Sequence, residues 1–303
     1  MMNMKLVSLF FLLLTTAACK KSVSNSNLQA ETFLNVSYGS NSLQKMDVYL
    51  PAKRNADTKV VVFIHGGSFI GGDKSDYTAL VEELYKKNFA VLNINYRLVD
   101  GSGLETNPIT HKKSSILIQD QVIDVSAAVD FVISKAEDWQ VSNSKIAVVG
   151  HSAGATLALL YSYGDKNTGK VKAVANLAGA LDQTFTDLPN YNLLPPPILE
   201  FGYRYTGFEV SPTNEQYYKA ISPLYVANAG KKINTLTIFP ENNVVGAFPK
   251  QNRATFDAFT NRLNQLGISN KFVQIPGADH SFTTAGSVQL MFIELLTFLG
   301  SSY

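Results

Sequence analysis

Short apolar runs alternate with longer amphipathic stretches along the chain, and this alternation predicts most of its secondary structure. Nearly every position is apolar in four runs that we expect to be buried strands: residues 59–64, 90–96, 145–149 and 171–177. Helical spacing of apolar residues predicts helices at residues 77–87, 116–136, 153–162 and 288–299. Asp76 is the expected N-cap of the first helix. Residues 33–38 and 44–50 flank a Gly-Ser-Asn turn and are expected to form an antiparallel pair. Strands that alternate with helices imply the α/β class, with a mostly parallel sheet covered by helices on both faces.

The pentapeptide Gly150-His151-Ser152-Ala153-Gly154 joins the predicted strand at 145–149 to the predicted helix at 153–162. A G-x-S-x-G sequence in that context is typical of a nucleophile elbow, a strained turn that exposes the serine hydroxyl. The two glycines allow the turn because they carry no Cβ. We therefore predict Ser152 as a catalytic nucleophile. The alternative is an ordinary β–α loop in which the serine caps a helix.

A second glycine-rich turn, His65-Gly66-Gly67-Ser68-Phe69, follows the buried run at 59–64. Backbone N–H groups of such a turn face a substrate oxygen in enzymes with an oxyanion hole, and the amide after the nucleophile adds another donor. We expect the N–H groups of Gly67, Ser68 and Ala153 to hold the oxyanion. Removal of one such donor typically lowers the rate by ~10²–10³.

His280 follows the last predicted strand, residues 271–275, and precedes the helix predicted at 288–299. The chain contains 4 histidines. His65 and His151 belong to the two turns described above, and His111 lies in a polar loop. His280 is therefore the candidate general base, which takes the Ser152 proton and returns it to the leaving group.

These motifs resemble the α/β-hydrolase superfamily, on the lipase and esterase branch that has an HGG-type oxyanion motif. The similarity runs from about residue 32 to the C-terminus, so that residues 32–303 form one α/β-hydrolase domain. It also includes the segments at residues 46–51, 71–75 and 95–98. The resemblance implies a carboxylesterase-like serine hydrolase that forms an acyl-enzyme. Feruloyl and acetyl esterases have related sequences, as do amidohydrolases of the kynurenine formamidase kind, which are the alternative activity.

The chain departs from this resemblance at the acid of the triad. The acid is expected in the turn after the strand at 235–238, and Asn243 stands in its place. An amide accepts a hydrogen bond from the imidazole but does not stabilise the imidazolium by charge; the same change in a serine protease lowers kcat by ~10⁴. Three interpretations stay open. Glu241 serves as the acid, Asp182 serves instead after the strand at 171–177, or the site is slow or silent and acts by binding.

Two segments are predicted as insertions near the site. Residues 100–113 are polar and form an expected surface loop, and residues 182 to about 230 form an expected small cap. The second segment holds a Pro-Pro-Pro run and many aromatic residues: Phe185, Tyr191, Phe201, Tyr203, Tyr205 and Phe208. We predict that it lines the acyl or alcohol pocket and favours a hydrophobic or aromatic ester. Ordinary packing within the cap explains each of these aromatic residues equally well.

Composition narrows the class of partner. Hydrophobic residues make up 46% of the chain, enough for a sizeable core, and the formal net charge is only +2. A charge this close to zero argues neither for nucleic acid nor for an acidic partner, and we expect no nucleic-acid partner. The sequence has no recognisable metal-binding or nucleotide-binding motif, so that we expect no metal and no cofactor. The expected partner is a small-molecule ester.

The N-terminus resembles a bacterial lipoprotein signal. Residues 6–14 are nearly all apolar but too short to span a bilayer, and small residues then lead to Cys19, the only cysteine. We expect residues 1–18 to be a signal peptide, Cys19 to be lipidated and residues 19–31 to be a flexible tether. Thr16 departs from the pattern, where a leucine is usual. The expected location is exported and lipid-anchored to a bacterial membrane, on its periplasmic or cell-surface side. The alternative is a secreted protein with a free thiol.

Overall fold

The central sheet has eight strands in the order β1-β2-β4-β3-β5-β6-β7-β8 in the computed structural model, which describes residues 27–303. The strands are β1 (Glu31–Ser37), β2 (Lys45–Leu50), β3 (Val60–Ile64), β4 (Ala90–Ile94), β5 (Ile146–His151), β6 (Ala173–Leu177), β7 (Asn234–Asn242) and β8 (Asn270–Asp279). The pairs β1–β2 and β2–β4 are antiparallel, and all later pairs are parallel. The predicted class and the antiparallel opening pair are confirmed.

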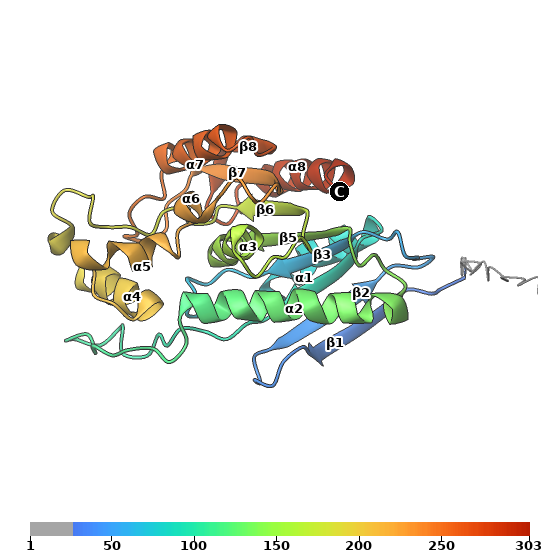
Figure 1. Ribbon diagram of the computed structural model, residues 1–303, viewed down its shortest axis with the longest axis horizontal. Helices are drawn as coiled ribbons and strands as arrows, with labels where there is room; N and C mark the ends of the chain where they lie inside the picture. The colour runs from blue at the N-terminus through green and yellow to red at the C-terminus, as the bar shows by residue number, and fades with distance from the viewer. Residues whose placement is uncertain (1–26) are drawn as a thin grey trace, which may run out of the picture.

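Helices cover both faces of the sheet (Figure 1). The long helices are α1 (Thr78–Lys86), α2 (Ile118–Trp139), α3 (Ala153–Tyr163), α7 (Arg253–Gln265) and α8 (Ser287–Ser301). One buried cluster packs the sheet against α2, α3 and α7, and a second packs its other face against α1 and α8. Successive residues of β3 alternate between these clusters, with Val62 in the first and Phe63 in the second. This explains why the central strands are uniformly apolar in sequence.

Two local details differ from the sequence predictions. Helix α1 is preceded by a 3-10 turn, η1 (Lys74–Tyr77), and Asp73 caps that turn by accepting from the Ser75 N–H. Asp76 is therefore not the N-cap of α1; its side chain instead accepts from the Asp73 N–H at 3.0 Å. Helix α7 was not predicted, although Phe256, Phe259 and Leu263 have helical spacing on its buried face.

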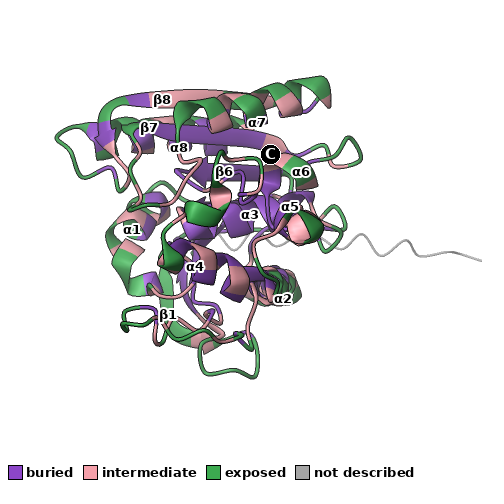
Figure 2. Cartoon of the chain, turned by 90° about the vertical axis from the view of Figure 1, so that its left-hand side faces the viewer, coloured by how far each residue is buried: buried purple, intermediate pink, exposed green. Residues whose placement is uncertain are grey.

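The segment between β6 and β7 forms a small helical cap. It contains α4 (Pro196–Thr206), α5 (Glu215–Lys219) and α6 (Pro223–Val226), with the short turns η2 (Tyr191–Leu193) and η3 (Pro212–Asn214). Figure 1 shows α4 and α5 at one end of the molecule, beyond the ends of the parallel strands. Figure 2 shows α4 at the centre of that end, between α1 and α5.

The buried Arg204 of α4 joins the cap to the polar loop at residues 100–113. Its guanidinium donates to the carbonyl oxygens of Asp100, Ser102 and Thr110 at 2.8, 2.7 and 2.5 Å. Glu200 pairs with the same guanidinium at 2.7 Å. The two segments predicted as insertions therefore pack against each other.

The predicted signal peptide and Cys19 lie outside the described residues. Within residues 27–303, no helix has both the length and the apolar character needed to cross a membrane. Strand β1 begins at Glu31, where the predicted tether ends.

Candidate active site

Ser152 lies at the tip of the sharp turn from β5 into α3. Its backbone has φ 52° and ψ −125°, a conformation that is strained for a residue with a side chain. The glycines on either side make room for it. A Cβ on Gly150 would lie 2.3 Å from the Gly154 carbonyl carbon, and one on Gly154 would lie 2.2 Å from the Ile64 oxygen. The turn thus packs backbone against backbone, which explains why both positions are glycine.

The structure brings Ser152, His280 and Asn243 into one hydrogen-bonded row. His280 Nε2 lies 2.9 Å from Ser152 Oγ, and His280 Nδ1 lies 2.7 Å from Asn243 Oδ1. Strand β8 ends at Asp279, so that His280 comes directly after the strand edge, and Asn243 comes directly after β7. Both partners therefore reach the serine from the carboxyl ends of neighbouring parallel strands.

The orientation of the Asn243 amide is fixed by a second hydrogen bond. Asn243 Nδ2 donates to the Gln251 carbonyl oxygen at 2.9 Å, which leaves Oδ1 to face the imidazole. Because Oδ1 only accepts, His280 Nδ1 carries the proton and Nε2 is left free to accept from the Ser152 hydroxyl. An amide in this orientation selects the tautomer that a general base requires, as in the Cys-His-Asn sites of papain-like proteases.

The two acidic candidates are engaged elsewhere. Glu241 Oε2 accepts from the Gly277 N–H at 2.7 Å, and its Oε1 accepts from Gln274 Nε2 at 3.1 Å. Asp182 pairs with Lys250 at 2.9 Å and accepts from the Thr184 hydroxyl at 2.7 Å. Neither carboxylate contacts His280, whose Nδ1 faces Asn243. The structure therefore does not place Glu241 or Asp182 as the acid of the triad, because local donors already hold both side chains.

Burial keeps the His280 imidazole neutral. Burial first, and then the neighbouring His151, lower the pKa of His280 from 6.5 to about 4, while the Asp279 carboxylate acts in the opposite direction. The His151 side chain contacts the backbone of His280, because its Nε2 donates to the His280 carbonyl at 2.8 Å. The other ring nitrogen of His151, Nδ1, faces the Tyr77 hydroxyl at 2.7 Å. At neutral pH, His280 is thus ready to accept a proton.

The glycine-rich turn after β3 lies next to the serine, because Ser68 and Ser152 line the same pocket. Gly67, Ser68 and Phe69 all have positive φ, at 125°, 50° and 64°. Within residues 27–303, no hydrogen bond of the protein uses the N–H groups of Gly67 or Ser68, whereas the Gly67 carbonyl accepts from Ile70 and Gly71. Ala153 is the first residue of α3, and among residues 27–303 its N–H has no hydrogen-bond acceptor, which leaves it a free donor at the positive end of a helix.

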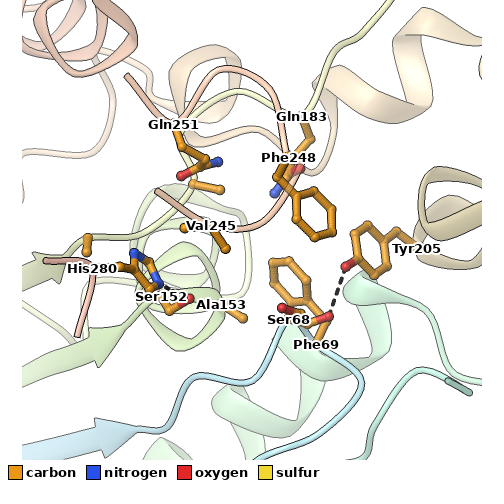
Figure 3. A pocket seen from close by; sticks show the side chains of 12 residues that line it. Ser68, Phe69, Ser152, Ala153, Gln183, Tyr205, Val245, Phe248, Gln251 and His280 are labelled. Atoms are coloured by element: carbon orange, nitrogen blue, oxygen red, sulfur yellow. Dashed lines mark hydrogen bonds between the residues drawn. The ribbon is translucent and has the colours of Figure 1, made fainter. Parts of the chain in front are cut away.

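Two side chains hold this turn in place. The Tyr205 hydroxyl, from cap helix α4, donates to the Ser68 carbonyl at 2.9 Å (Figure 3). The His65 ring stacks on Tyr96 with centroids 4.4 Å apart, and its Nδ1 lies 2.6 Å from the Gly66 oxygen. Sequence reasoning did not identify the role of Tyr205, because it depends on a contact between residues far apart in the chain.

A pocket of about 360 Å³, part of it open to solvent, lies over Ser152. Ser68, Ala153 and His280 line it, whereas Gly67 is not among its lining residues. The other walls are formed by aromatic, small and amide side chains: Phe69, Ala178, Ala180, Gln183, Tyr205, Val245, Phe248 and Gln251.

Of the cap aromatics predicted to line this pocket, only Tyr205 does so. Phe185 packs on Tyr218 at 5.9 Å between ring centroids, and Phe208 stacks on Tyr217 at 3.5 Å. Ordinary packing within the cap, the other interpretation weighed from the sequence, describes these residues. The loop from Asn243 to Asn252 instead supplies three lining residues that the sequence did not single out.

The described part of the chain contains no cluster of three or more histidine, cysteine or acidic side chains arranged to hold a metal ion.

Comparison with known proteins gives the same fold. Residues 46–192, just under half of the chain, match the family described as BD-FAE. A truncated carbohydrate esterase from gut microbiota has a TM-score of 0.68 at 21% identity, covering 91% of this chain and 97% of its own. Esterase B from Lactobacillus rhamnosis has a TM-score of 0.67 at 15% identity, covering 90% and 86%. The predicted resemblance to HGG-type α/β-hydrolases is confirmed at the level of fold.

Curated relatives match over shorter stretches. Kynurenine formamidase from Salmo salar is 26% identical over 145 residues, which are 47% of this chain and 42% of the relative. A probable isoprenylcysteine alpha-carbonyl methylesterase from Arabidopsis thaliana is 28% identical over 160 residues, 52% of this chain and 30% of the relative. A putative alpha/beta hydrolase from Acanthamoeba polyphaga mimivirus is 24% identical over 242 residues, covering 76% and 63%. The chain thus spans less than two thirds of each of these relatives.

Proposed function

The chain has the α/β-hydrolase fold, and we propose that it is a serine hydrolase that cleaves carboxylic esters through an acyl-enzyme on Ser152. The observation that carries the proposal is the row Ser152–His280–Asn243, with contacts of 2.9 and 2.7 Å. The esterases among its structural neighbours and the methylesterase among its relatives support the ester as substrate class.

The geometry suggests a role for each group. His280 Nε2 accepts the Ser152 proton while Oγ attacks the ester carbonyl, and the N–H groups of Ser68 and Ala153 donate to the oxygen that becomes negative. The protonated imidazole then returns its proton to the leaving alcohol, which leaves the acyl group on Oγ. Water attacks that ester in the second half-reaction, and His280 again accepts the proton.

The direct test is hydrolysis of p-nitrophenyl acetate and butyrate by the mature domain, with Ser152→Ala beside the wild type. We expect turnover by the wild type and loss of it in the variant. Labelling with a fluorophosphonate probe gives an independent readout, since only an activated serine reacts. A wild-type protein that neither turns over ester nor labels at Ser152 would contradict the proposal and favour a binding role.

The second candidate is cleavage of an amide, favoured by the kynurenine formamidases among the relatives. The same groups would act, with His280 protonating a nitrogen leaving group. An aryl formamide assayed beside the matched aryl formate ester distinguishes the two, because an esterase prefers the better leaving group and a formamidase has been selected for the amide.

We also propose that the protein is exported and lipid-anchored through Cys19, on the sequence evidence alone. Metabolic labelling with a palmitate analogue in a bacterial host tests this directly. We expect the wild-type chain to be labelled and found with membranes, and the Cys19→Ser chain to be unlabelled and released by fractionation. An unlabelled wild-type chain would contradict the anchor without bearing on the chemistry at Ser152.

A further inference from the structure

Gln183 is a buried residue at the wall of the pocket, and its side-chain amide makes no hydrogen bond to another residue among residues 27–303. Gln183 is only 4% exposed and lies in the segment that follows β6. Its backbone N–H donates to Ser222 Oγ at 2.7 Å. Within residues 27–303, however, no hydrogen bond involves its side-chain oxygen or nitrogen, although the side chain lines the pocket.

The Gln183 side chain lines the pocket, and its amide carries both donors and an acceptor that no other described residue uses. Figure 3 shows the amides of Gln183 and Gln251 on the side of the pocket away from Ser68 and Phe69. Both amides are thus available to a molecule that reacts at Ser152.

The rest of the pocket restricts the chemistry of that molecule. Among the described residues that line it, none is acidic, and none is basic apart from His280. Lys250, the nearest cation in sequence to these residues, pairs with Asp182 and Asp187 at 2.9 and 2.6 Å. Phe69 and Phe248 add apolar surface. A carboxylate, phosphate or ammonium group would enter this pocket without a counter-charge.

We propose that Gln183 is a specificity-determining residue that binds a hydroxyl group of the substrate, and that the natural substrate is a neutral ester that bears such a hydroxyl. A hydroxyl both donates and accepts at one atom, so that it pairs with either end of the Gln183 amide. The inference deepens the proposed esterase function and depends on it.

The physical consequence is selectivity rather than a faster reaction on every ester. A site with a polar group awaiting a hydroxyl discriminates strongly against the analogue without it, because that analogue leaves the polar group unpaired. Since the pocket is partly open to solvent, water pairs with the amide when no substrate does. We therefore expect a preference of about 10-fold to 100-fold in kcat/KM, well below the limit of a closed site.

Two matched pairs of esters test the proposal, since the hydroxyl lies on either the acid or the alcohol. Methyl 3-(4-hydroxyphenyl)propionate is compared with methyl 3-phenylpropionate, and glyceryl monoacetate with propyl acetate. The ratio of kcat/KM within each pair is measured for the wild type, Gln183→Met and Gln251→Met. Methionine keeps the length and shape of glutamine but lacks its donors and acceptor.

We expect the wild type to prefer the hydroxyl-bearing ester at least about 10-fold in one pair, and Gln183→Met to reduce that ratio below about 3-fold. Gln251→Met should retain most of the wild-type preference for the hydroxyl-bearing ester. Equal rates within both pairs, or a preference that survives in Gln183→Met, overturn the assignment. A preference lost only in Gln251→Met assigns the hydroxyl to the other amide and overturns it as well.

Two measurements keep this outcome separate from failure of the proposed function. Wild-type hydrolysis of p-nitrophenyl acetate reports the esterase chemistry, and it requires no hydroxyl. The Tm of each variant and its labelling by a fluorophosphonate report folding and an intact Ser152. A labelled, folded enzyme that hydrolyses the acetate but ignores the hydroxyl refutes the role of Gln183 alone.

Discussion

Replacement of Asn243 by aspartate separates a working amide from a lost acid. The substitution gives His280 an anionic partner at the same 2.7 Å contact. In the wild type, Asn243 Nδ2 donates to the Gln251 carbonyl at 2.9 Å. The substitution replaces this donor with an oxygen that faces the same carbonyl. The first change stabilises the imidazolium that forms in the transition state. The second leaves two acceptors face to face.

The two effects are of similar size. A hydrogen bond to a charged group contributes about 1.5–3 kcal/mol against about 1 for a neutral one, so the gain is roughly 0.5–2 kcal/mol. The unpaired acceptors cost about 1–3 kcal/mol. We therefore expect the kcat/KM of Asn243→Asp at neutral pH to stay within about tenfold of the wild type. A site that had merely lost its acid would instead gain up to ~10⁴.

The pH profile gives an independent readout of the same substitution. In the proposed mechanism His280 accepts a proton only when it is neutral, and burial lowers its pKa to about 4. We therefore expect wild-type kcat/KM to fall as the pH drops through that value and to be flat above it. A carboxylate beside the ring favours the protonated form, so that Asn243→Asp moves this acid limb to higher pH.

The assay is kcat/KM for p-nitrophenyl butyrate between about pH 3 and 9, with the exposed Asn242→Asp as the matched charge control. Asn242→Asp should leave the acid limb of the kcat/KM profile near its wild-type pH. A rise of several orders of magnitude in Asn243→Asp would refute the reasoning, because it would mean that the amide does not supply the required tautomer.

Three further substitutions test other parts of the site. Glu241→Gln should change kcat/KM less than about threefold, because the carboxylate bonds Gly277 and not the imidazole; a large loss would restore Glu241 as the acid. Tyr205→Phe removes a hydrogen bond worth about 0.5–1.5 kcal/mol to the glycine-rich turn after β3 and should lower kcat about two- to tenfold. Its control is Tyr218→Phe, which loses a part-buried hydrogen bond within the cap; equal effects of the two substitutions would deny Tyr205 a positioning role. Gly154→Ala should lower both Tm and activity, because its Cβ meets backbone at 2.2 Å, whereas Gly300→Ala has open space and should change neither.

The parts of the fold that follow from local pattern could be predicted from the sequence. The uniformly apolar β3 and β5 required burial on both faces, and the glycines of the elbow required a turn without a Cβ. Ser152 and His280 followed from their positions after strands, because parallel strands all end at the same edge of the sheet. Helix α7 carried a readable signal as well, with Asn252 as its cap and apolar residues at helical spacing.

The walls of the pocket could not be predicted in the same way. Gln183 and Phe248 lie in segments without regular periodicity, and they meet over Ser152 only because the cap and the loop after β7 fold toward each other. Sequence favoured aromatic residues of the cap because they are large and numerous, yet most of them pack within the cap itself. The number of apolar residues in a segment does not determine which of them faces a cavity.

Asp182 does not contact His280, but it is linked to the Asn243–His280 contact through the loop after β7. Its carboxylate pairs with Lys250, whose side chain is only 9% exposed, and Lys250 precedes Gln251 in the loop after β7. The Gln251 carbonyl in turn accepts from Asn243, which orients the amide against His280. A path of contacts therefore runs from the start of the cap to His280. Because a carbonyl acceptor orients an amide but repels a carboxylate, this loop is built around asparagine, and the amide in the triad is consistent with its surroundings rather than a defect in them.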